Sequence, residues 1–458
     1  MKLTYNVNDR PTFGKLITFA IQQMLAIMAA TIAVPMIVGN GMSTAAAMFG
    51  AGVGTIIYLL FTKFKSPVFL GSSFAFIGSM SAAFAGGVSM ALGYLGLIVG
   101  AVMAGFVYVI ISIIIKLVGV NWINKLMPPV VIGPTVALIG LSLAGPAIKD
   151  VFSYGPQDTN GAFIMSPAIW ASLICALVTL VVIILCSVYG KKMGRLIPFI
   201  IGILSGYAVA SVFTVIGDLM GIAEIKLIDF SVFASYMMPD GGVSLETFLS
   251  VPDFTFLTAF DGVAEFNAQY LTTLFVAYVP VAFVVFAEHI ADHKNLSSII
   301  EHDLLEDPGL SRTLLGDGVG SMFGAFFGGC PNTTYGESVG CVAITKNASV
   351  ITILFAAIGC ILISFITPLV AFVNSIPGCV MGGVCITLYG FIAVSGLKMI
   401  QKVNLESNAN LFTVASILIP GIGGMAMAIG KVTITAIASS LILGIIVNII
   451  GSKASEQE

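Results

Sequence analysis

The sequence predicts an all-α polytopic membrane protein with fourteen transmembrane segments, and two observations lead to this fold class. Of the 458 residues, 58% are hydrophobic and only 9% are charged, whereas a soluble protein carries roughly a quarter of its residues as charged side chains. The apolar residues are also grouped into runs of about 20, the length that crosses the hydrocarbon core of a bilayer as a helix.

The apolar runs form two sets of seven. The first set lies near 14–38, 44–62, 68–86, 91–115, 126–148, 163–189 and 195–222, and the second near 268–291, 312–328, 331–346, 349–372, 376–397, 408–427 and 430–451. We expect a first repeat over 1–222, an external connection over 223–267 and a second repeat over 268–458. Because seven is odd, the second set begins on the opposite side of the membrane, so related sets would be inverted repeats, as in many secondary transporters.

The basic residues support this count and predict the orientation. With the N-terminus inside, all of the 19 Lys and Arg residues except Lys149, Lys226 and Lys431 fall on the inner side, in keeping with the positive-inside rule. We therefore expect both termini on the cytoplasmic side of a cytoplasmic (inner or plasma) membrane. The net charge of −3, without a basic patch, argues against a nucleic-acid partner.

Two spans at equivalent positions are interrupted. The segments "SPVFLGSSFAFIGSMSAAFAGG" (66–87) and "GGCPNTTYGESVGCVAITK" (328–346) are each the third span of their set, and both contain Gly, Ser or Thr where an apolar run is expected. Such a pair indicates a transporter's binding site, because half-helices that begin within the bilayer expose backbone N–H groups. We expect Ser72, Ser73 and residues 332–334 to cap these starts; the alternative is two kinked helices.

Ionisable residues inside apolar spans are the second indication of a site, since they are costly there and usually functional. Glu337 lies in the second interrupted span, and Glu288 follows the run "LFVAYVPVAFVVFA". Glu288 and Asp292 share one helical face, and His289 and His293 share another, because residues four apart are neighbours. We expect His293 and the following lysine to lie at the wet end of this helix. No metal-ligand pattern such as H-E-x-x-H is present, so we predict no metal and no other cofactor.

These groups together predict a ligand. Carboxylates accept hydrogen bonds from N–H groups, and the exposed N–H groups of a half-helix donate to carbonyl oxygens. A small planar imide, with C=O and N–H alternating along its edge, satisfies both. Either glutamate could also carry a coupled proton.

Five strings of this chain are similar to the nucleobase–ascorbate transporter family (nucleobase:cation symporter-2), and within it to the bacterial branch that transports uracil. They are "MAATIAVP" (28–35), "LGSSFAF" (70–76), "AEH" (287–289), "DLLEDPGL" (303–310) and "PNTTYGESVGCVAITK" (331–346). The resemblance covers nearly the whole chain. It implies fourteen spans in two inverted seven-span repeats, divided into a core and a gate domain, with short strands where spans three and ten are interrupted.

The resemblance also implies the function and the site. It implies a secondary transporter, not an enzyme, that imports uracil by proton symport and has the lipid bilayer as its surroundings. The acidic 223–267 connection is compatible with a solvated face, a gate or a contact in a homodimer. The substrate-binding groups implied by the family are the backbone at Phe74 and Gly336, the carboxylates of Glu288 and Glu337, and Ala30 and Tyr335 beside the ring.

The chain departs from the family pattern at three positions. Ser338 stands where the family has Asn, Gln23 follows Gln22 where the family usually has His, and Asp292 stands where uracil permeases have His. The proton-coupling candidates are therefore Glu288, Asp292 and Glu337.

Other functions remain as alternatives. One is a purine or xanthine symporter of the same family. An anion exchanger of the sulfate-transporter type belongs to a different class and predicts a basic or neutral site, against which two glutamates argue. We find neither the P-loop lysine nor the G-x-S-x-G pattern of enzymes.

Overall fold

The computed structural model describes residues 3–119, 122, 128–191, 193–234, 237, 242–429 and 432–455, and over these ranges the chain is mostly helical. Within these ranges, eight helical segments are long and apolar enough to cross a membrane. Seven of them are α1 (Phe13–Val38), α2 (Thr44–Phe61), α4 (Met90–Val118), α8 (Pro167–Tyr189), α10 (Pro198–Met220), α13 (Ala268–Ile300) and α18 (Gly378–Ile400), and the eighth is Pro129–Val151. Two further long helices are α14 (Leu310–Gly328) and α20 (Ala436–Ser455). All of these helices fall on the apolar runs of the sequence, so the chain is a multi-pass membrane protein.

Several expected spans are divided into shorter helices. These are α6 (Pro129–Ser142) with α7 (Ala144–Val151), α9 (Met193–Leu196) before α10, and α16 (Val350–Ile363) with α17 (Thr367–Asn374). The last two spans were expected at 408–427 and 430–451. In the structure α19 (Asn408–Ile422) ends earlier, and two strands that pair with each other, β3 (Met427–Ile429) and β4 (Val432–Ile434), lie between α19 and α20. The expected starts at 126 and 430, and Lys431, lie outside the described residues.

The 223–267 connection contains only short elements among its described residues. They are η2 (Ala223–Ile225), α11 (Ser231–Ala234), α12 (Thr255–Ala259) and η3 (Phe260–Glu265). A remaining turn, η4 (Leu305–Gly309), joins α13 to α14.

The chain forms two compact units, and each is discontinuous in sequence. Unit 1 comprises Met1–Ser142, Pro252–Leu362 and Ile392–Glu458, and unit 2 comprises Leu143–Val251 and Ile363–Phe391. Helix α18 contributes to both. Each half of the sequence therefore supplies chain to both units.

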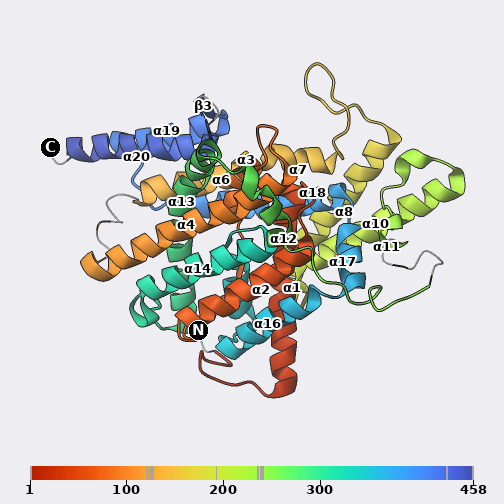
Figure 1. Cartoon of the computed structure of the whole chain (residues 1–458), viewed down its shortest axis with the longest axis horizontal. Coiled ribbons are helices and arrows are strands. Elements are labelled where there is room, and N and C mark those ends of the chain that lie inside the picture. The colour runs from red at the N-terminus through yellow and green to blue at the C-terminus, as the bar shows by residue number, and fades with distance from the viewer. Residues whose placement is uncertain are drawn as a thin grey trace. The chain divides into compact units, whose positions relative to one another are not determined.

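Close helix packing through glycine organises the core of unit 1. Helix α14 packs against both α2 and α4, and Figure 1 shows the three side by side. A Cβ added at Gly54 would lie 2.7 Å from the carbonyl oxygen of Gly320, and one at Gly105 would lie 2.8 Å from that of Gly318. Small residues allow helix backbones to approach in this way, which is the usual basis of helix association in membranes.

The two interrupted spans meet in a short sheet. Strand β1 (Leu70–Ser72) pairs antiparallel with β2 (Asn332–Thr334), and Leu70 lies opposite Thr334. The strands lead into the 3-10 turn η1 (Phe74–Phe76) with α3 (Ile77–Ala83), and into α15 (Gly336–Thr345). The sheet satisfies backbone groups that a helix would otherwise pair, which is required wherever a span is interrupted.

The expected capping residues do not cap the half-helices. Residues 332–334 form β2, and α15 instead begins after Tyr335, whose side chain makes no capping hydrogen bond. Ser72 belongs to β1, and Ser73 precedes η1 without a side-chain cap. For residues 332–334 the prediction was wrong because the strand ends before the N-cap residue of α15, Tyr335, and the Thr334 hydroxyl donates to Asp292 instead. Ser73 does hold the N-cap position of η1, but its side chain makes no capping hydrogen bond.

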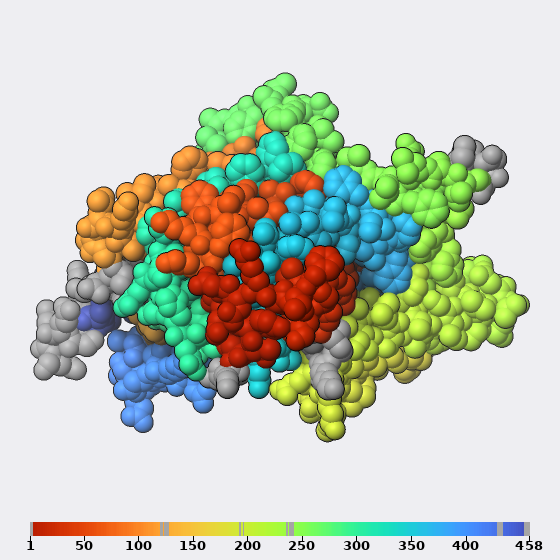
Figure 2. Space-filling model, turned by 90° about the horizontal axis from the view of Figure 1, so that it is seen from below, coloured from red at the N-terminus to blue at the C-terminus, as the bar shows by residue number. Residues whose placement is uncertain are grey.

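The N-terminal segment is held against the end of α15. The N–H of Thr4 donates to the carbonyl of Lys346 at 2.8 Å, and the N–H of Ala348 donates to that of Tyr5 at 2.9 Å. Figure 2 shows this segment in red on the face seen from below. In unit 2, α8 packs against α10, and the N–H of Thr367 donates to the carbonyl of Phe248 at 3.0 Å.

Candidate functional site

The start of α15 is the centre of the candidate site. Gly336 is its first residue and Glu337 its second, and the first helical bond reaches from the N–H of Val339 to the carbonyl of Tyr335 at 3.2 Å. The N–H groups at the beginning of a helix have no partner within that helix and carry a partial positive charge. Gly336 is exposed and Glu337 half-buried, although residues 331–335 are buried. This start is therefore open to a ligand.

Two carboxyl groups of α13 lie beside this start. Glu288 and Asp292 are half-buried, and α13 packs against β2, η1 and α15. Thr334 donates a hydrogen bond from its Oγ1 to Oδ2 of Asp292 at 2.8 Å, and a Cβ at Gly336 would lie 3.8 Å from Oδ1 of Asp292. Glu288, Asp292 and Glu337 interact electrostatically with one another. Three acids from two helices thus meet at one helix start.

The remaining predicted residues occupy the surroundings of this start. Phe74 begins η1, which packs on α13. Ala30 is 2% exposed on α1, a helix that packs against β1 and α15. Tyr335 is buried, its hydroxyl donates to the carbonyl of Ser72 at 2.8 Å, and its ring covers Gly71. Tyr335 therefore joins the two strands.

Two of the residues that depart from the family pattern are in contact. The hydroxyl oxygen of Ser338 accepts a hydrogen bond from the N–H of Phe69 at 2.9 Å and another from Nε2 of Gln23. All three groups are buried. Ser338 thereby joins the first turn of α15 to α1 and to the chain before β1, which fixes the position of the adjacent Glu337.

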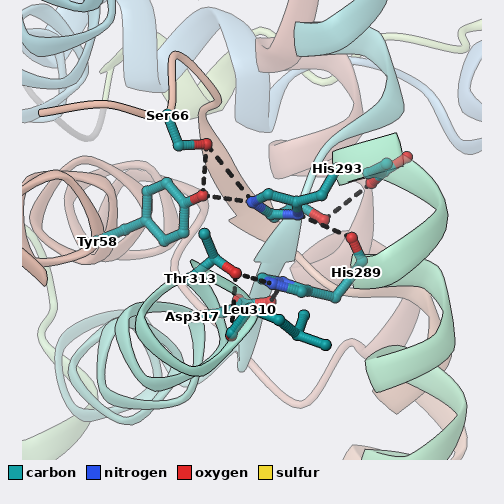
Figure 3. A network of polar contacts seen from close by, with 9 residues as sticks. Tyr58, Ser66, His289, His293, Leu310, Thr313 and Asp317 are labelled. Atoms are coloured by element: carbon teal, nitrogen blue, oxygen red, sulfur yellow. Dashed lines mark hydrogen bonds and ion pairs between the residues drawn. The ribbon is translucent and has the colours of Figure 1, made fainter. Parts of the chain in front are cut away.

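The other face of α13 carries a sealed polar network, drawn in Figure 3. His293 is 1% exposed, so the expectation that it lies at the wet end of the helix was wrong; Lys294 is exposed as expected. Nε2 of His293 lies 2.6 Å from the hydroxyl of Tyr58, which is 2.7 Å from Oγ of Ser66. The helix continues beyond the predicted end at 291, and α2 covers the histidine.

His289, also on α13, belongs to the same network and connects this helix to α14. Its Nδ1 is 2.7 Å from Oδ2 of Asp317, and its Nε2 is 3.0 Å from Oγ1 of Thr313. Asp317 is fully buried. Asp317 was not among the residues predicted from the sequence, although a carboxylate within "TLLGDGVGSMFGAFF" is the same signal that identified the two glutamates.

A multi-pass helical protein in which two interrupted spans meet beside half-buried acids has the construction of a secondary transporter. The sequence matches the model of a permease family over residues 14–430. It is 38% identical to the uracil permease of Bacillus caldolyticus over 98% of this chain and 95% of that protein. It is 35% identical to the uracil permease of Escherichia coli K12 over 96% of this chain and 92% of that protein. The chain belongs to this permease family, the nucleobase–ascorbate transporters, and its relatives are named as transporters, not as enzymes.

Solved structures with the same fold come from other transporters. The transmembrane domain of the cyanobacterial bicarbonate transporter BicA matches with a TM-score of 0.60 and 14% identity, over 96% of this chain and 99% of that one. The murine anion transporter Slc26a9 in its inward-facing state matches with a TM-score of 0.64 and 11% identity, over 98% of this chain and 69% of that one. At these identities the likeness concerns the fold alone.

Proposed function

We propose that this protein imports uracil together with protons across the cytoplasmic membrane. The observation that carries the proposal is the convergence of Glu288, Asp292 and Glu337 on the exposed helix start at Gly336. The named substrate of the two permeases described above supports the choice of uracil.

The binding mode follows from donors and acceptors. The carboxylates of Glu288 and Glu337 accept hydrogen bonds from the N–H groups of the imide edge, and the backbone at Phe74 and Gly336 donates to its carbonyl oxygens. Ala30 and Tyr335 lie beside the ring. An anion would be repelled by these carboxylates, so this arrangement favours a neutral, flat ligand over the anions named for the structural neighbours.

The same acids supply a reason for proton symport. Charges of one sign this close together repel strongly in a medium of low dielectric constant, so taking up a proton together with the substrate relieves the repulsion. Glu288, Asp292 and Glu337 are the candidates for this proton, and the Thr334 hydroxyl holds Asp292 in place.

The membrane arrangement is part of the proposal. We assign fourteen spans in two inverted repeats, 1–222 and 268–458, joined by the external connection 223–267, with both termini in the cytoplasm. Unit 1, which holds both interrupted spans, serves as the core domain in the lipid bilayer, and unit 2 serves as the gate. This arrangement is compatible with a homodimer.

Uptake of labelled uracil into proteoliposomes, with and without an inward proton gradient, tests this function. We expect the gradient to drive accumulation, and we expect excess unlabelled uracil to compete better than xanthine, other purines, sulfate or bicarbonate. Glu337→Gln should abolish binding and uptake, whereas Asp292→Asn should leave exchange intact and weaken coupling. Accumulation of xanthine or an anion in place of uracil would overturn the substrate assignment. Uracil uptake that ignores the proton gradient would overturn the symport.

A further inference from the structure

We propose that His289, Asp317 and Thr313 form a second proton-binding site, and that the proton held there is the one that allows Glu288 to bind the substrate as an anion. The proposal rests on the proposed symport of uracil and protons, and it assigns the order of events: the proton binds first and the substrate second. It concerns the sealed face of α13, not the face that meets the ligand.

The hydrogen-bond geometry shows that this group of residues can exist in two protonation states. In one, the Thr313 hydroxyl donates to the carbonyl of Leu310 at 3.1 Å, so its oxygen accepts from Nε2–H of His289. The contact of 2.7 Å between Nδ1 of His289 and Oδ2 of Asp317 must then contain a proton, because two bare acceptors would repel each other. The histidine and the carboxyl group are together neutral in this state.

The second state contains one proton fewer. If the Thr313 hydroxyl rotates toward Nε2, it donates to a bare nitrogen, and Nδ1–H of His289 donates to the carboxylate of Asp317. Each short contact again holds one hydrogen, so no heavy atom has to move. A threonine hydroxyl rotates about its C–O bond, and this rotation lets the site gain or lose a proton at the cost of one hydrogen bond, that from Thr313 to the carbonyl of Leu310.

The environment makes the proton-free state costly in this conformation. His289, Thr313 and Asp317 are each 0% exposed, and Oδ1 of Asp317 has no hydrogen-bond partner among the described residues. A buried carboxylate with one unsatisfied oxygen is expensive. The structure therefore favours the neutral, proton-loaded state.

The groups that face Asp317 connect it to the substrate site. Asp317 interacts electrostatically with Glu288 and Asp292 of α13, with Tyr58 of α2 and with Tyr108 of α4. The ring of His293 lies 4.0 Å from that of His289, centroid to centroid.

Loss of the proton would place an anion at Asp317 near the acids of the site, which Glu337 joins from α15. Glu288 directly precedes His289 in the chain, so it could then be ionised only at a high electrostatic cost. With the proton in place, Glu288 can be an anion and accept the N–H of the ligand.

Uracil affinity measured by calorimetry across a range of pH tests this assignment. For the wild type we expect affinity to fall by about tenfold per pH unit once the pair is deprotonated, because a proton and a ligand that favour each other are linked reciprocally. Asp317→Asn mimics the neutral state, so its affinity should change less than about twofold over the same range. In proteoliposomes this variant should still exchange uracil, but it should accumulate less uracil and move fewer protons per uracil than the wild type, as followed by a pH-sensitive dye, because the acids at the start of α15 remain.

Two further variants complete the design. Asp317→Glu keeps a group that can be protonated and should restore the pH dependence at least in part. Ser112→Ala is the matched control, because it removes a hydroxyl that also joins α14 to a neighbouring helix, through Ser311 at 2.8 Å, and it should behave as the wild type.

The possible results separate this inference from the proposed function. If the wild type binds no uracil or shows no gradient-driven uptake, the proposed function fails. If the wild type is coupled and Asp317→Asn keeps the same pH dependence and accumulation, only the inference fails; it also fails if folded Asp317→Asn binds no uracil at any pH. Should Asp317→Asn not fold, infrared difference spectra of wild type and of a variant that combines Glu288→Gln, Asp292→Asn and Glu337→Gln decide, because this variant keeps Asp317 and lacks the three acids of the substrate site. A carboxylic-acid band that is lost at alkaline pH in both supports the assignment, and its absence overturns it.

Discussion

Helix α13 has two polar faces that differ in how their groups are satisfied. On one face Glu288 and Asp292 are half-buried beside the exposed helix start at Gly336. On the other face His289 and His293 are fully enclosed by α2 and α14, and each ring nitrogen has a partner within 3.0 Å. The first face keeps hydrogen-bonding capacity for a ligand, whereas the second uses its capacity within the protein.

This difference predicts different consequences of mutation. A change at Glu288 on the open face removes a partner of the substrate and leaves the fold intact, because, unlike Asp292, which accepts from the buried Thr334 hydroxyl, Glu288 accepts no hydrogen bond from a buried group among the described residues. A change on the sealed face leaves a buried polar group without a partner, which costs free energy of folding.

The largest effect should come from the open face. Replacing Glu288 with Gln removes the negative charge that holds an N–H of the ligand, and hydrogen bonds to charged groups contribute about 1.5–3 kcal/mol. We expect the Kd for uracil to rise by roughly 10- to 150-fold, while the thermal unfolding temperature stays the same or rises because repulsion among the acids decreases. Calorimetry and an unfolding scan of the purified variant measure both. A fall in unfolding temperature with unchanged affinity would contradict the comparison.

The sealed face should show the opposite pattern. Tyr58→Phe deletes a hydroxyl that contacts both His293 and Ser66. These two buried groups then have only their long mutual contact of 3.5 Å, so the free energy of unfolding should fall by about 1–3 kcal/mol. Uracil affinity should stay within about twofold of the wild type.

Tyr94→Phe is the control for this change, because the Tyr94 hydroxyl donates to the carbonyl of Asn40 at 3.0 Å in an exposed setting. Its stability should change by less than about 0.5 kcal/mol. Equal losses in the two variants would mean that burial of the network does not matter.

The contact between Ser338 and Gln23 should affect both properties, since it positions the acid of α15 through a buried hydrogen bond. We expect a double-mutant cycle of Gln23→Ala and Ser338→Ala to show a coupling of about 0.5–3 kcal/mol in the free energy of unfolding, as is usual for residues in contact. Uracil affinity should fall in each single variant and fall little further in the double variant. Fully additive losses would show that the two side chains act independently.

Much of the fold was accessible from the sequence, because apolar runs of membrane length are a strong local signal. The runs at 14–38, 44–62 and 91–115 correspond to α1, α2 and α4 within a few residues. The pairing of Met427–Ile429 with Val432–Ile434 was missed, because the residues of these two strands are nearly as apolar as the helix that follows. The error at residues 332–334 has a related cause, because a polar run within an apolar segment is equally compatible with a helix cap and with a short strand.

The candidate site could be predicted only in part. Glu288 and Glu337 were identifiable as charges in apolar runs, and the spacing of four placed Asp292 with Glu288. Their meeting with Gly336 depends on contacts across about 50 residues of sequence. The burial of His293 also could not be foreseen, because it depends on Tyr58 of a helix in the first half of the chain.

The smallest effect should come from the loop that follows α13, outside both faces. Lys65 donates hydrogen bonds to both carboxylate oxygens of Asp307, at 2.6 and 2.8 Å, and this contact lowers the pKa of Asp307. Both side chains are about half exposed, so solvent and salt screen the pair and its contribution should be small. Lys65→Met should therefore lower the unfolding temperature only slightly at neutral pH.

The direction of the pH effect tests this explanation. A carboxyl group whose pKa is lowered by folding contributes stability above its unfolded pKa, and this stability is lost as the pH falls through the folded pKa. The difference between wild type and Lys65→Met should therefore vanish on acidification and also at high salt, while Lys402→Met, a change of an exposed lysine on another loop, should show no such trend. A difference that persists unchanged in acid and at high salt would mean that the lysine stabilises the loop through packing of its methylene groups, and that its ion pair with Asp307 contributes no measurable stability.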